Sequence, residues 1–274
     1  MKTIGLIGAE NVHAKHFAEA INEKKLFDGF RVTGVLGDDS KEKADELSKA
    51  YGLEICGTLP EIIKSCDAFL ITYRKGSAHY NAAMQVLEAG KPVLIDKPFT
   101  SDPGQAKEIT DYAKKNNLLI CGGSAFKELE ALGNVRQKIV PGCTAVISFA
   151  ADKNSEYEGY NFYGCHSVEI CLALFGTQYK SVSAYTNGNT IISTIKYEDK
   201  QCIIINSPVL YDLNITVYGE KTADFFSVQK NYQTIHAGEL VNMIKTGKPP
   251  REYDYYVSAV KLTNDIVTKL KLNE

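Results

Sequence analysis

Several features that mark other classes of protein are missing from this chain of 274 residues. It has no tryptophan, and its 31 lysine and arginine residues are balanced by 33 acidic ones. Because charges of both signs are interspersed, the basic surface that a nucleic acid requires is missing, and we expect no nucleic-acid partner. No apolar run approaches the roughly 18 to 20 residues of a membrane span, and the first residues show no signal-peptide pattern. We therefore expect a cytoplasmic protein with no membrane partner.

The cysteines also lack any spacing that would indicate a metal site or a disulfide framework. There are seven of them, scattered along the chain, with no Cys-x-x-Cys pair and no Cys/His pair at zinc-finger spacing. Most lie within apolar stretches, which favours small buried side chains in a reducing compartment. We expect no bound metal. The length and the hydrophobic share of 44% are typical of two globular domains.

Residues 1–122 alternate short apolar runs with amphipathic segments, a pattern typical of a parallel sheet with crossover helices. The expected strands are Thr3–Gly8, Arg31–Leu36, Glu54–Cys56, Ala68–Thr72, Pro92–Ile95 and Leu118–Cys121. The expected helices are Asn11–Asn22, Lys41–Ala50, Leu59–Lys64, Ala78–Ala89 and Pro103–Asn116. Strands joined by right-handed crossovers predict a doubly wound Rossmann-type parallel sheet, and hence an α/β fold.

The pattern changes near residues 122–124, where we place a domain boundary. Beyond it, the expected helices are Ala125–Ile139, His166–Leu174, Ile235–Lys245 and Tyr255–Lys271. The expected strands are Thr144–Ala150, Thr190–Lys196, Cys202–Asn206, Leu213–Tyr218 and Ala223–Val228. Hairpin signals between alternating runs predict an α+β domain built on a largely antiparallel sheet. We therefore expect a dinucleotide-binding domain at 1–123 and a substrate and oligomerisation domain at 124–274.

A Rossmann-type sheet places the pyrophosphate of a dinucleotide at the start of the first helix, where backbone N–H groups are available. Of the G-x-G-x-x-G fingerprint only Gly8 is kept, because Glu10 and His13 occupy the second and third glycine positions. A Glu10 carboxylate aimed at the phosphate would cost about 3 kcal/mol at roughly 5 Å and an effective dielectric near 20. Glu10 could instead turn to solvent. His13 could donate to a phosphate, or it could pack against or cap the helix.

Acidic residues follow the second strand. Asp38 stands where an acidic side chain ordinarily accepts a hydrogen bond from the adenosine ribose, which favours NAD over NADP because a carboxylate repels a 2′-phosphate. The alternative interpretation is that Asp38, Asp39 and Ser40 simply cap the next helix.

The run 90–98 delivers a Lys-Pro pair at the carboxyl end of a buried strand, the edge where ligands bind in open α/β sheets. Asp96-Lys97-Pro98 resembles the Glu-Lys-Pro hallmark of the Gfo/Idh/MocA family, the group of glucose-fructose oxidoreductase and inositol dehydrogenase. The stretch 65–90, which includes His79, is similar to the family's strand-loop-His-helix. Gly164-Cys165-His166 with Glu169 resembles its Gly-x-His-x-x-Asp helix. The resemblance covers almost the whole chain.

The resemblance implies an NAD(P)-dependent oxidoreductase that transfers hydride between a nicotinamide and a hydroxyl or carbonyl of a sugar- or polyol-like small molecule. It implies that Lys97 hydrogen-bonds the reacting hydroxyl and that His166 exchanges its proton, since a neutral imidazole is a suitable base and a cationic lysine stabilises an alkoxide. The expected cofactor-binding residues are Gly8, Glu10, Asn11, His13, Asp38, Thr72, His79, Asp96 and Pro98. The expected substrate-binding residues are Tyr160, Asn161 and Tyr163.

Phe162 departs from the family pattern, in which an Asp often stands four residues before the histidine. Glu169 could orient His166 in its place, or it could be an ordinary solvated helix residue. A non-catalytic ligand-binding or regulatory protein that kept the fold is therefore the alternative function. The family commonly dimerises through the open face of the second sheet, so we expect a homodimer or homotetramer.

Overall fold

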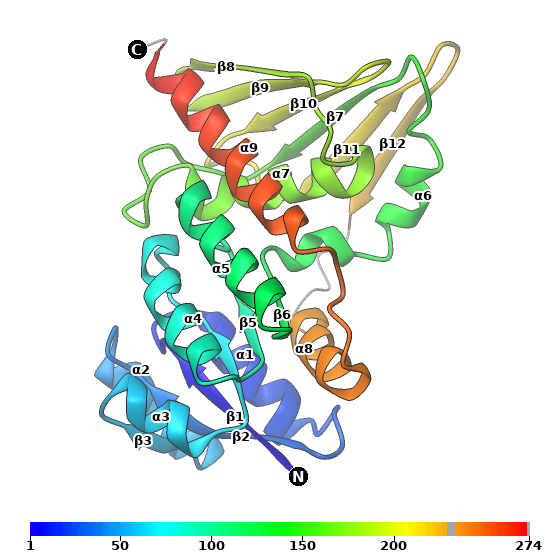
Figure 1. Ribbon diagram of the computed structural model, residues 1–274. Coiled ribbons are helices and arrows are strands. Elements are labelled where there is room, and N and C mark those ends of the chain that lie inside the picture. Colours follow the sequence, from blue (N-terminus) through cyan, green and yellow to red (C-terminus); the bar gives the residue numbers. More distant parts are fainter. Residues whose placement is uncertain (229–233, 273–274) are drawn as a thin grey trace. The chain divides into compact units, whose positions relative to one another are not determined.

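A computed structural model describes residues 1–228 and 234–272 (Figure 1). Within them the chain forms two compact units, the first containing residues 1–123 and 234–257 and the second containing residues 124–228 and 258–272. Each unit is built on a six-stranded sheet. The α/β fold class expected from the sequence is confirmed.

The sheet of the first unit is parallel throughout. Its strands are β1 (Lys2–Ile7), β2 (Phe30–Leu36), β3 (Glu54–Cys56), β4 (Ala68–Ile71), β5 (Val93–Ile95) and β6 (Ile120–Gly122). They are ordered β3-β2-β1-β4-β5-β6. The direction of winding reverses between β1 and β4, which is the switch point where doubly wound folds bind ligands. The predicted Rossmann-type sheet is confirmed.

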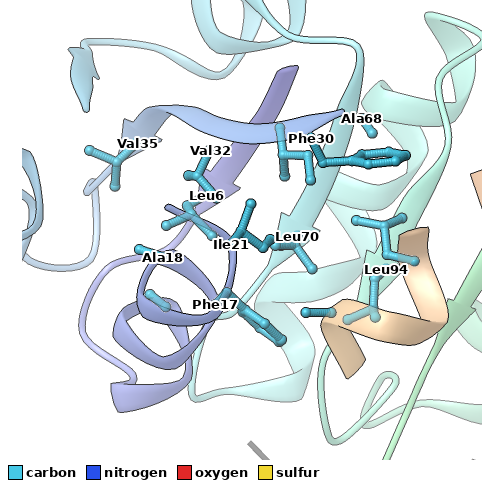
Figure 2. Packing of buried hydrophobic residues seen from close by; sticks show 14 of the residues in the cluster. Leu6, Phe17, Ala18, Ile21, Phe30, Val32, Val35, Ala68, Leu70 and Leu94 are labelled. Carbon is cyan, nitrogen blue, oxygen red and sulfur yellow. The ribbon is translucent and has the colours of Figure 1, made fainter. Parts of the chain in front are cut away.

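Helices connect these strands and bury one stripe each against the sheet. They are α1 (Val12–Ala18), α2 (Lys41–Tyr51), α3 (Leu59–Ser65), α4 (His79–Glu88) and α5 (Pro103–Lys115). Ser40, Thr58 and Asp102 cap three of them, each accepting a hydrogen bond from a backbone N–H three residues further on. Leu6, Leu70 and other strand residues pack with helix residues in a dry core (Figure 2).

The first helix is shorter than the expected Asn11–Asn22. After α1 the chain forms a π-helical turn, η1 (Glu19–Glu23), in which the N–H of Lys24 donates to the carbonyl of Glu19 at 2.8 Å. This turn presents the amide of Asn22 to the backbone of Val32, to which it both donates and accepts, at 2.8 and 2.9 Å. A side chain that satisfies strand backbone groups favours the wider turn over a regular helix.

Helix α8 (Ile235–Thr246) belongs to the first unit, whereas the sequence interpretation placed this stretch in a domain spanning 124–274. Its apolar residues Ala237, Leu240, Val241 and Met243 are buried in the same cluster as the first sheet. The spacing of these residues gives the helix one apolar stripe, and burying that stripe brings the segment back to the first unit.

The sheet of the second unit is mixed and mostly antiparallel. Its strands are β7 (Thr144–Phe149), β8 (Ser181–Asn187), β9 (Thr190–Lys196), β10 (Gln201–Asn206), β11 (Leu213–Tyr218) and β12 (Ala223–Val228). They are ordered β12-β11-β7-β10-β9-β8, and only β7 and β10 pair in parallel. Alternate residues of the central strands are buried against α7 (Asn161–Phe175). Helix α9 (Asp254–Lys271) ends the described chain.

Two helices of this half differ from their expected bounds. The single helix expected at Ala125–Ile139 is wrong, because the chain forms a 3-10 turn, η3 (Ala125–Glu128), and a separate helix, α6 (Leu132–Arg136). Phe126 and Lys127 are buried and held against α7, and the chain then extends at Leu129 before α6 begins. Helix α7 begins five residues before the expected His166, at Asn161.

All seven cysteines are buried and free, as their apolar surroundings predicted. Burial raises the pKa of Cys56, Cys143 and Cys202, so these thiols stay protonated at neutral pH. Among the residues that the structure describes, no helix combines the length and the apolar composition needed to span a membrane.

Candidate active site

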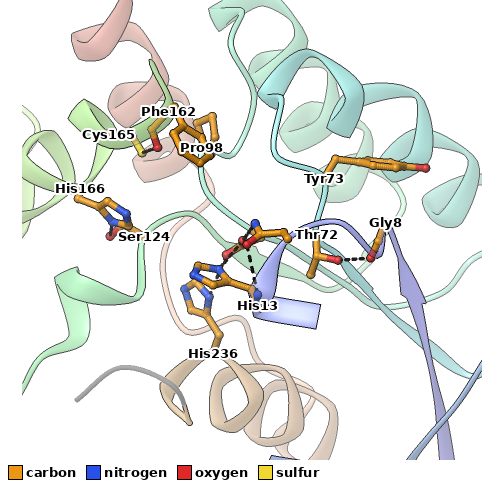
Figure 3. A network of polar contacts seen from close by, with 12 residues as sticks. Gly8, His13, Thr72, Tyr73, Pro98, Ser124, Phe162, Cys165, His166 and His236 are labelled. Carbon is orange, nitrogen blue, oxygen red and sulfur yellow. Dashed lines mark hydrogen bonds and ion pairs between the residues drawn. The ribbon is translucent and has the colours of Figure 1, made fainter. Parts of the chain in front are cut away.

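The loop between β1 and α1 is shaped by Gly8. Its φ of +93° lies in the left-handed region, and a Cβ there would approach the backbone nitrogen of Tyr73 to 2.9 Å, so a larger residue would not fit. The hydroxyl of Thr72, at the end of β4, donates to the carbonyl of Gly8 at 2.6 Å (Figure 3). Thr72 is fully buried, and its contact fixes the loop at the switch point.

The next two backbone N–H groups of this loop hold a carboxylate. Ala9 and Glu10 donate to the two oxygens of Asp39 at 2.8 and 3.1 Å. Burial raises the pKa of Asp39, and the two N–H groups act in the opposite direction. The Glu10 carboxylate itself lies 3.6 Å from the guanidinium of Arg74. The loop therefore presents an anion-binding backbone, as expected at a helix start.

For Asp38 and Ser40 the sequence left helix capping open as an interpretation, and in the structure only Ser40 caps the helix. Ser40 caps α2 by accepting from the N–H of Lys43. Asp38 instead accepts a hydrogen bond from the hydroxyl of Tyr73, with its two oxygens at 2.8 and 3.0 Å. Burial, together with the adjoining Asp38, raises the pKa of Tyr73, which therefore remains a donor. Asp38 is thus held at the end of β2 by a residue from the end of β4.

The carboxyl end of β5 carries a buried charge. Asp96 is fully buried, and one of its oxygens lies 2.7 Å from Nδ1 of His13 and 3.3 Å from the amide nitrogen of Asn11. The other oxygen lies 3.4 Å from Nδ1 of His236 on α8. Burial alone would raise the pKa of Asp96, but the two histidines lower it well below its usual range. Asp96 therefore ties α1, β5 and α8 together as an anion.

Lys97 and Pro98 follow Asp96 and are held by a buried histidine. Lys97 is buried, and its peptide bond to Pro98 is cis. The fully buried His79 lies with Nδ1 2.7 Å from the carbonyl oxygen of Pro98 and Nε2 2.9 Å from that of Tyr73. Burial lowers the pKa of His79. His79 therefore joins the loop after β4 to the loop after β5.

In the second unit, His166 lies on α7 among aromatic rings. Its Nδ1 is 2.6 Å from the hydroxyl oxygen of Ser124, and the ring of Phe126 stacks on the imidazole with centroids 4.4 Å apart (Figure 3). Tyr163 and Phe149 meet the same ring edge-on, at 5.4 and 6.0 Å. His166 is 5% exposed, which restricts it to few orientations.

The remaining residues expected near His166 have separate roles. Glu169 accepts from the N–H of Ser124 at 2.6 Å, and it pairs with the buried Lys127 at 3.4 Å. Tyr160 lies in the interior and donates to Asn206 at 2.9 Å, which supports a packing role rather than a substrate contact. Asn161 begins α7, and Phe162 packs against Tyr157 and Tyr163.

Comparisons with known proteins identify the first unit. Residues 2–123 match the model of the Gfo/Idh/MocA family, described as an oxidoreductase family with an NAD-binding Rossmann fold. Residues 2–123 belong to the Gfo/Idh/MocA family. An uncharacterized oxidoreductase of Schizosaccharomyces pombe is 29% identical over 146 residues, covering 47% of this chain and 39% of that protein. An inositol 2-dehydrogenase of Cereibacter sphaeroides is 31% identical over 110 residues, covering 39% of this chain and 31% of that protein.

Solved structures extend the likeness in fold to the second unit. A putative myo-inositol dehydrogenase from Sinorhizobium meliloti superposes with a TM-score of 0.82 at 18% identity, covering 99% of this chain and 98% of that one. At this identity the likeness concerns the fold alone. The sequence matches to curated relatives span only 39% and 31% of their length in the two cases above, so the likeness in sequence is concentrated in the Gfo/Idh/MocA Rossmann unit.

Within this Gfo/Idh/MocA unit, the structure brings together most residues singled out from the sequence. At the carboxyl edge of the first sheet, Asn11 and His13 both contact Asp96. His79 separately contacts the carbonyl of Pro98 in the loop that follows. No motif pointed to His236, which lies 3.4 Å from Asp96 although the two residues are 140 positions apart in the chain. Tyr73, Arg74 and Ser124 were also missed. Each contacts a residue that the sequence had singled out, namely Asp38, Glu10 and His166 respectively.

Proposed function

We propose that the chain is an NAD(P)-dependent oxidoreductase that transfers hydride between a nicotinamide and a hydroxyl or carbonyl of a sugar- or polyol-like molecule. The observation that supports it most directly is the buried Asp96-Lys97 pair placed directly after β5, at the edge of a doubly wound sheet whose first loop holds an anion. The inositol dehydrogenase among the relatives supports the substrate class.

The residues of the first loop fit a dinucleotide. Gly8 gives the loop its left-handed turn against Tyr73, and the two N–H groups after it donate to the Asp39 carboxylate, so they are oriented toward negative charge. Glu10, which stands where glycine is usual, is drawn aside by Arg74 at 3.6 Å. A cavity of about 490 Å³ adjoins the loop, and its lining includes both the basic residues Lys15 and Lys43 and the acidic residues Glu10 and Glu46.

The proposed chemistry uses Lys97 and His166. A bound nicotinamide would accept the hydride that leaves the carbinol carbon. Lys97 would donate a hydrogen bond to the hydroxyl oxygen and stabilise the alkoxide that develops there. Nε2 of His166 would take the hydroxyl proton, so that the carbon–oxygen bond becomes a carbonyl. In the reverse direction the imidazolium returns this proton.

We also propose a preference for NAD over NADP. Asp38 is held at the end of β2 by Tyr73, so its carboxylate lies where the adenosine ribose is expected, while the Asp39 carboxylate is bound by the first loop. One unit of negative charge at roughly 5 Å and an effective dielectric near 20 would oppose a 2′-phosphate by about 3 kcal/mol. NADP would bind only at that cost.

Cofactor titration tests the function and the preference together. Fluorescence of the reduced nicotinamide is followed while protein is added to NADH or NADPH, and the absence of tryptophan removes competing protein emission. We expect NADH to bind at least roughly tenfold more tightly than NADPH. Asp38→Asn should narrow this ratio, whereas Asp45→Asn on the exposed face of α2 should leave it unchanged. No binding of either nucleotide at millimolar concentration would overturn the proposed function.

A non-catalytic ligand-binding or regulatory protein is the second candidate function. Phe162 favours it, since a ring packed against Tyr157 and Tyr163 neither accepts a proton nor orients a substrate hydroxyl. A panel of polyols and sugars, beginning with myo-inositol, separates the two functions when it is incubated with NAD⁺ and NADH formation is followed. Cofactor binding without turnover across the panel would support the second candidate.

We further propose that the chain self-associates through the outward face of the second sheet, as a homodimer or as a homotetramer built from such dimers. Residues in register across the strands form a row of apolar and threonine side chains on the face that α7 does not cover. They are Phe225, Thr216, Val146, Ile203 and Thr194. Phe225 is 75% exposed, which a partner surface would relieve.

A further inference from the structure

We infer that Ser124 positions His166 by accepting a hydrogen bond from Nδ1–H, which leaves the lone pair on Nε2 as the group that exchanges a proton. This inference rests on the proposed role of His166. Ser124 does not belong to any motif singled out in the sequence, and it acts through His166 rather than on a substrate.

The contact between the two residues is short and enclosed. The Ser124 hydroxyl oxygen lies 2.6 Å from Nδ1 of His166, and Ser124 is fully buried. The same hydroxyl oxygen accepts from the N–H of Phe126 at 3.1 Å, and the Phe126 ring stacks on the imidazole. Because Ser124 caps η3 and Phe126 lies within it, one short segment fixes the position and the plane of His166.

A hydroxyl suits this position because it has two lone pairs. One lone pair accepts from the Phe126 N–H, and the other is available to Nδ1–H of His166. When His166 is neutral with its proton on Nδ1, Nε2 is a base. When Nε2 takes a proton, the Nδ1–H contact to Ser124 is unchanged. The same hydrogen bond therefore serves both protonation states of the imidazole, with no rearrangement of the site.

Glu169, the residue that the sequence suggested might orient His166, supports Ser124 instead. One of its oxygens accepts from the Ser124 N–H at 2.6 Å, and the other lies 3.4 Å from Nζ of the buried Lys127. Lys127 in turn donates to the Ser124 carbonyl at 2.9 Å. The buried ion pair thus holds both backbone groups of Ser124, and the lysine compensates the carboxylate charge.

This arrangement has a chemical consequence for His166. A carboxylate on Nδ1 would stabilise the imidazolium and hold its proton, whereas the neutral Ser124 hydroxyl stabilises it less. The imidazolium therefore returns its proton more readily than it would beside a carboxylate. This suits a hydride transfer that runs in both directions, because proton uptake and release occur at the same nitrogen.

The tautomer of His166 tests the inference without a substrate. Long-range ¹H–¹⁵N correlation spectra of histidine-labelled protein distinguish Nδ1–H from Nε2–H, and loss of a signal in His166→Asn identifies its resonances among the five histidines. We expect neutral His166 to be the Nδ1–H tautomer in the wild-type protein. Ser124→Ala should shift it toward Nε2–H, and Ser124→Thr, which keeps a hydroxyl, should restore Nδ1–H.

Ser193→Ala is the matched control, since Ser193 is a fully buried serine of the same unit whose hydroxyl contacts no polar partner within the described chain. It should leave the His166 tautomer unchanged. An Nε2–H tautomer in the wild-type protein, or an unchanged tautomer in Ser124→Ala, would overturn the inference. The wild-type spectrum alone decides the first point, even if the alanine variant were to fold poorly.

Turnover of a polyol from the panel separates this inference from the proposed function. Ser124→Ala should lower kcat by about tenfold while KM for NAD⁺ stays within a few fold, and Ser124→Thr should recover most of the loss. If His166→Asn left kcat unchanged while the tautomer followed the predicted pattern, the proposed role of His166 would fail and its positioning by Ser124 would stand. A kcat loss in Ser124→Ala that Ser124→Thr does not recover would count against the inference.

Discussion

Lys97 is a buried lysine that directly follows the buried Asp96 in the chain. Such a residue is costly to bury unless its charge serves a purpose, and its place directly after Asp96 at the edge of the sheet matches a group that binds a developing alkoxide. The neighbouring contacts from His79 to Pro98 and from His13 to Asp96 hold the backbone on both sides of it. Lys97 is thus carried by a segment that has little freedom to move.

Replacing Lys97 separates substrate chemistry from cofactor binding. Lys97→Ala should reduce kcat by about 10²–10³-fold, the loss typical of one group that stabilises an oxyanion. NADH affinity should remain within a few fold, because the lysine acts on the substrate. Stopped-flow turnover and the fluorescence titration measure the two quantities separately. Lys107→Ala, an exposed lysine of α5, is the control, and a loss of NADH affinity by two decades would move Lys97 to another role.

At the residue scale, motifs in the sequence predicted the proposed reacting residues but missed residues that contact the predicted site. Lys97, Asp96 and His166 could be found because short runs of residue types around them are informative. Ser124, Tyr73 and His236 could not, because each acts through a partner 35 to 140 positions away. A contact between distant segments has no local signature in one sequence.

Helix α8 is attached to the first unit by a stripe of apolar residues and by one polar contact. The periodic apolar residues of Ile235–Thr246 predicted a helix, and the structure confirms one. Its attachment to the first unit depends on burial of residues such as Leu240 and on His236 facing Asp96 at 3.4 Å. Conversely, the expected helix at 125–139 is interrupted because Phe126 and Lys127 are fixed by tertiary contacts that periodicity does not report.

The contact between α8 and β5 predicts a pH dependence of stability. The pKa of Asp96 is held well below its usual range by His13 and His236, although burial opposes them. A group whose folded pKa is depressed stabilises the fold above its unfolded pKa of about 4, and the contribution is lost as the pH falls through the folded pKa. Asp96→Asn should therefore lower the free energy of unfolding by roughly 3–5 kcal/mol at pH 7, the usual cost of removing one partner from a buried pair.

Urea unfolding of the wild type and Asp96→Asn at a series of pH values checks this prediction. The difference between the two proteins should be full at pH 7 and should shrink below about pH 4. Asp45→Asn, at an exposed position of α2, should show no such trend. A constant difference down to the lowest pH at which the chain folds would mean that Asp96 stabilises through packing rather than through its charge.

At the scale of the whole molecule, the alternation of strands and helices predicted the first sheet and the change of sheet type after it. The order of the second sheet could not be predicted, since β7 and β10 pair in parallel across 57 positions while their neighbours are antiparallel. The return of 234–257 to the first unit was also missed. Both features depend on which apolar faces pack against each other. A periodic pattern predicts an apolar face but does not predict the surface against which that face packs.

The outward face of the second sheet carries the last prediction. In strand β10, Cys202, Ile204 and Asn206 are buried against α7. Ile203 and Ile205 alternate with them, point to the opposite face of the sheet and are only partly buried. A stable dimer buries about 800 Å² on each partner, which a six-stranded face can supply.

Sedimentation velocity at micromolar concentration should therefore show a dimer or tetramer for the wild-type chain. Ile203→Glu should shift it to smaller species, because a carboxylate at the centre of an apolar interface is buried without a partner. Lys269→Glu reverses a charge on α9, which contributes no residue to the row on this face, and should leave the assembly intact. Circular dichroism confirms that each variant is folded. A monomeric wild type, or an Ile203→Glu variant that still assembles, would show that this face is not the interface.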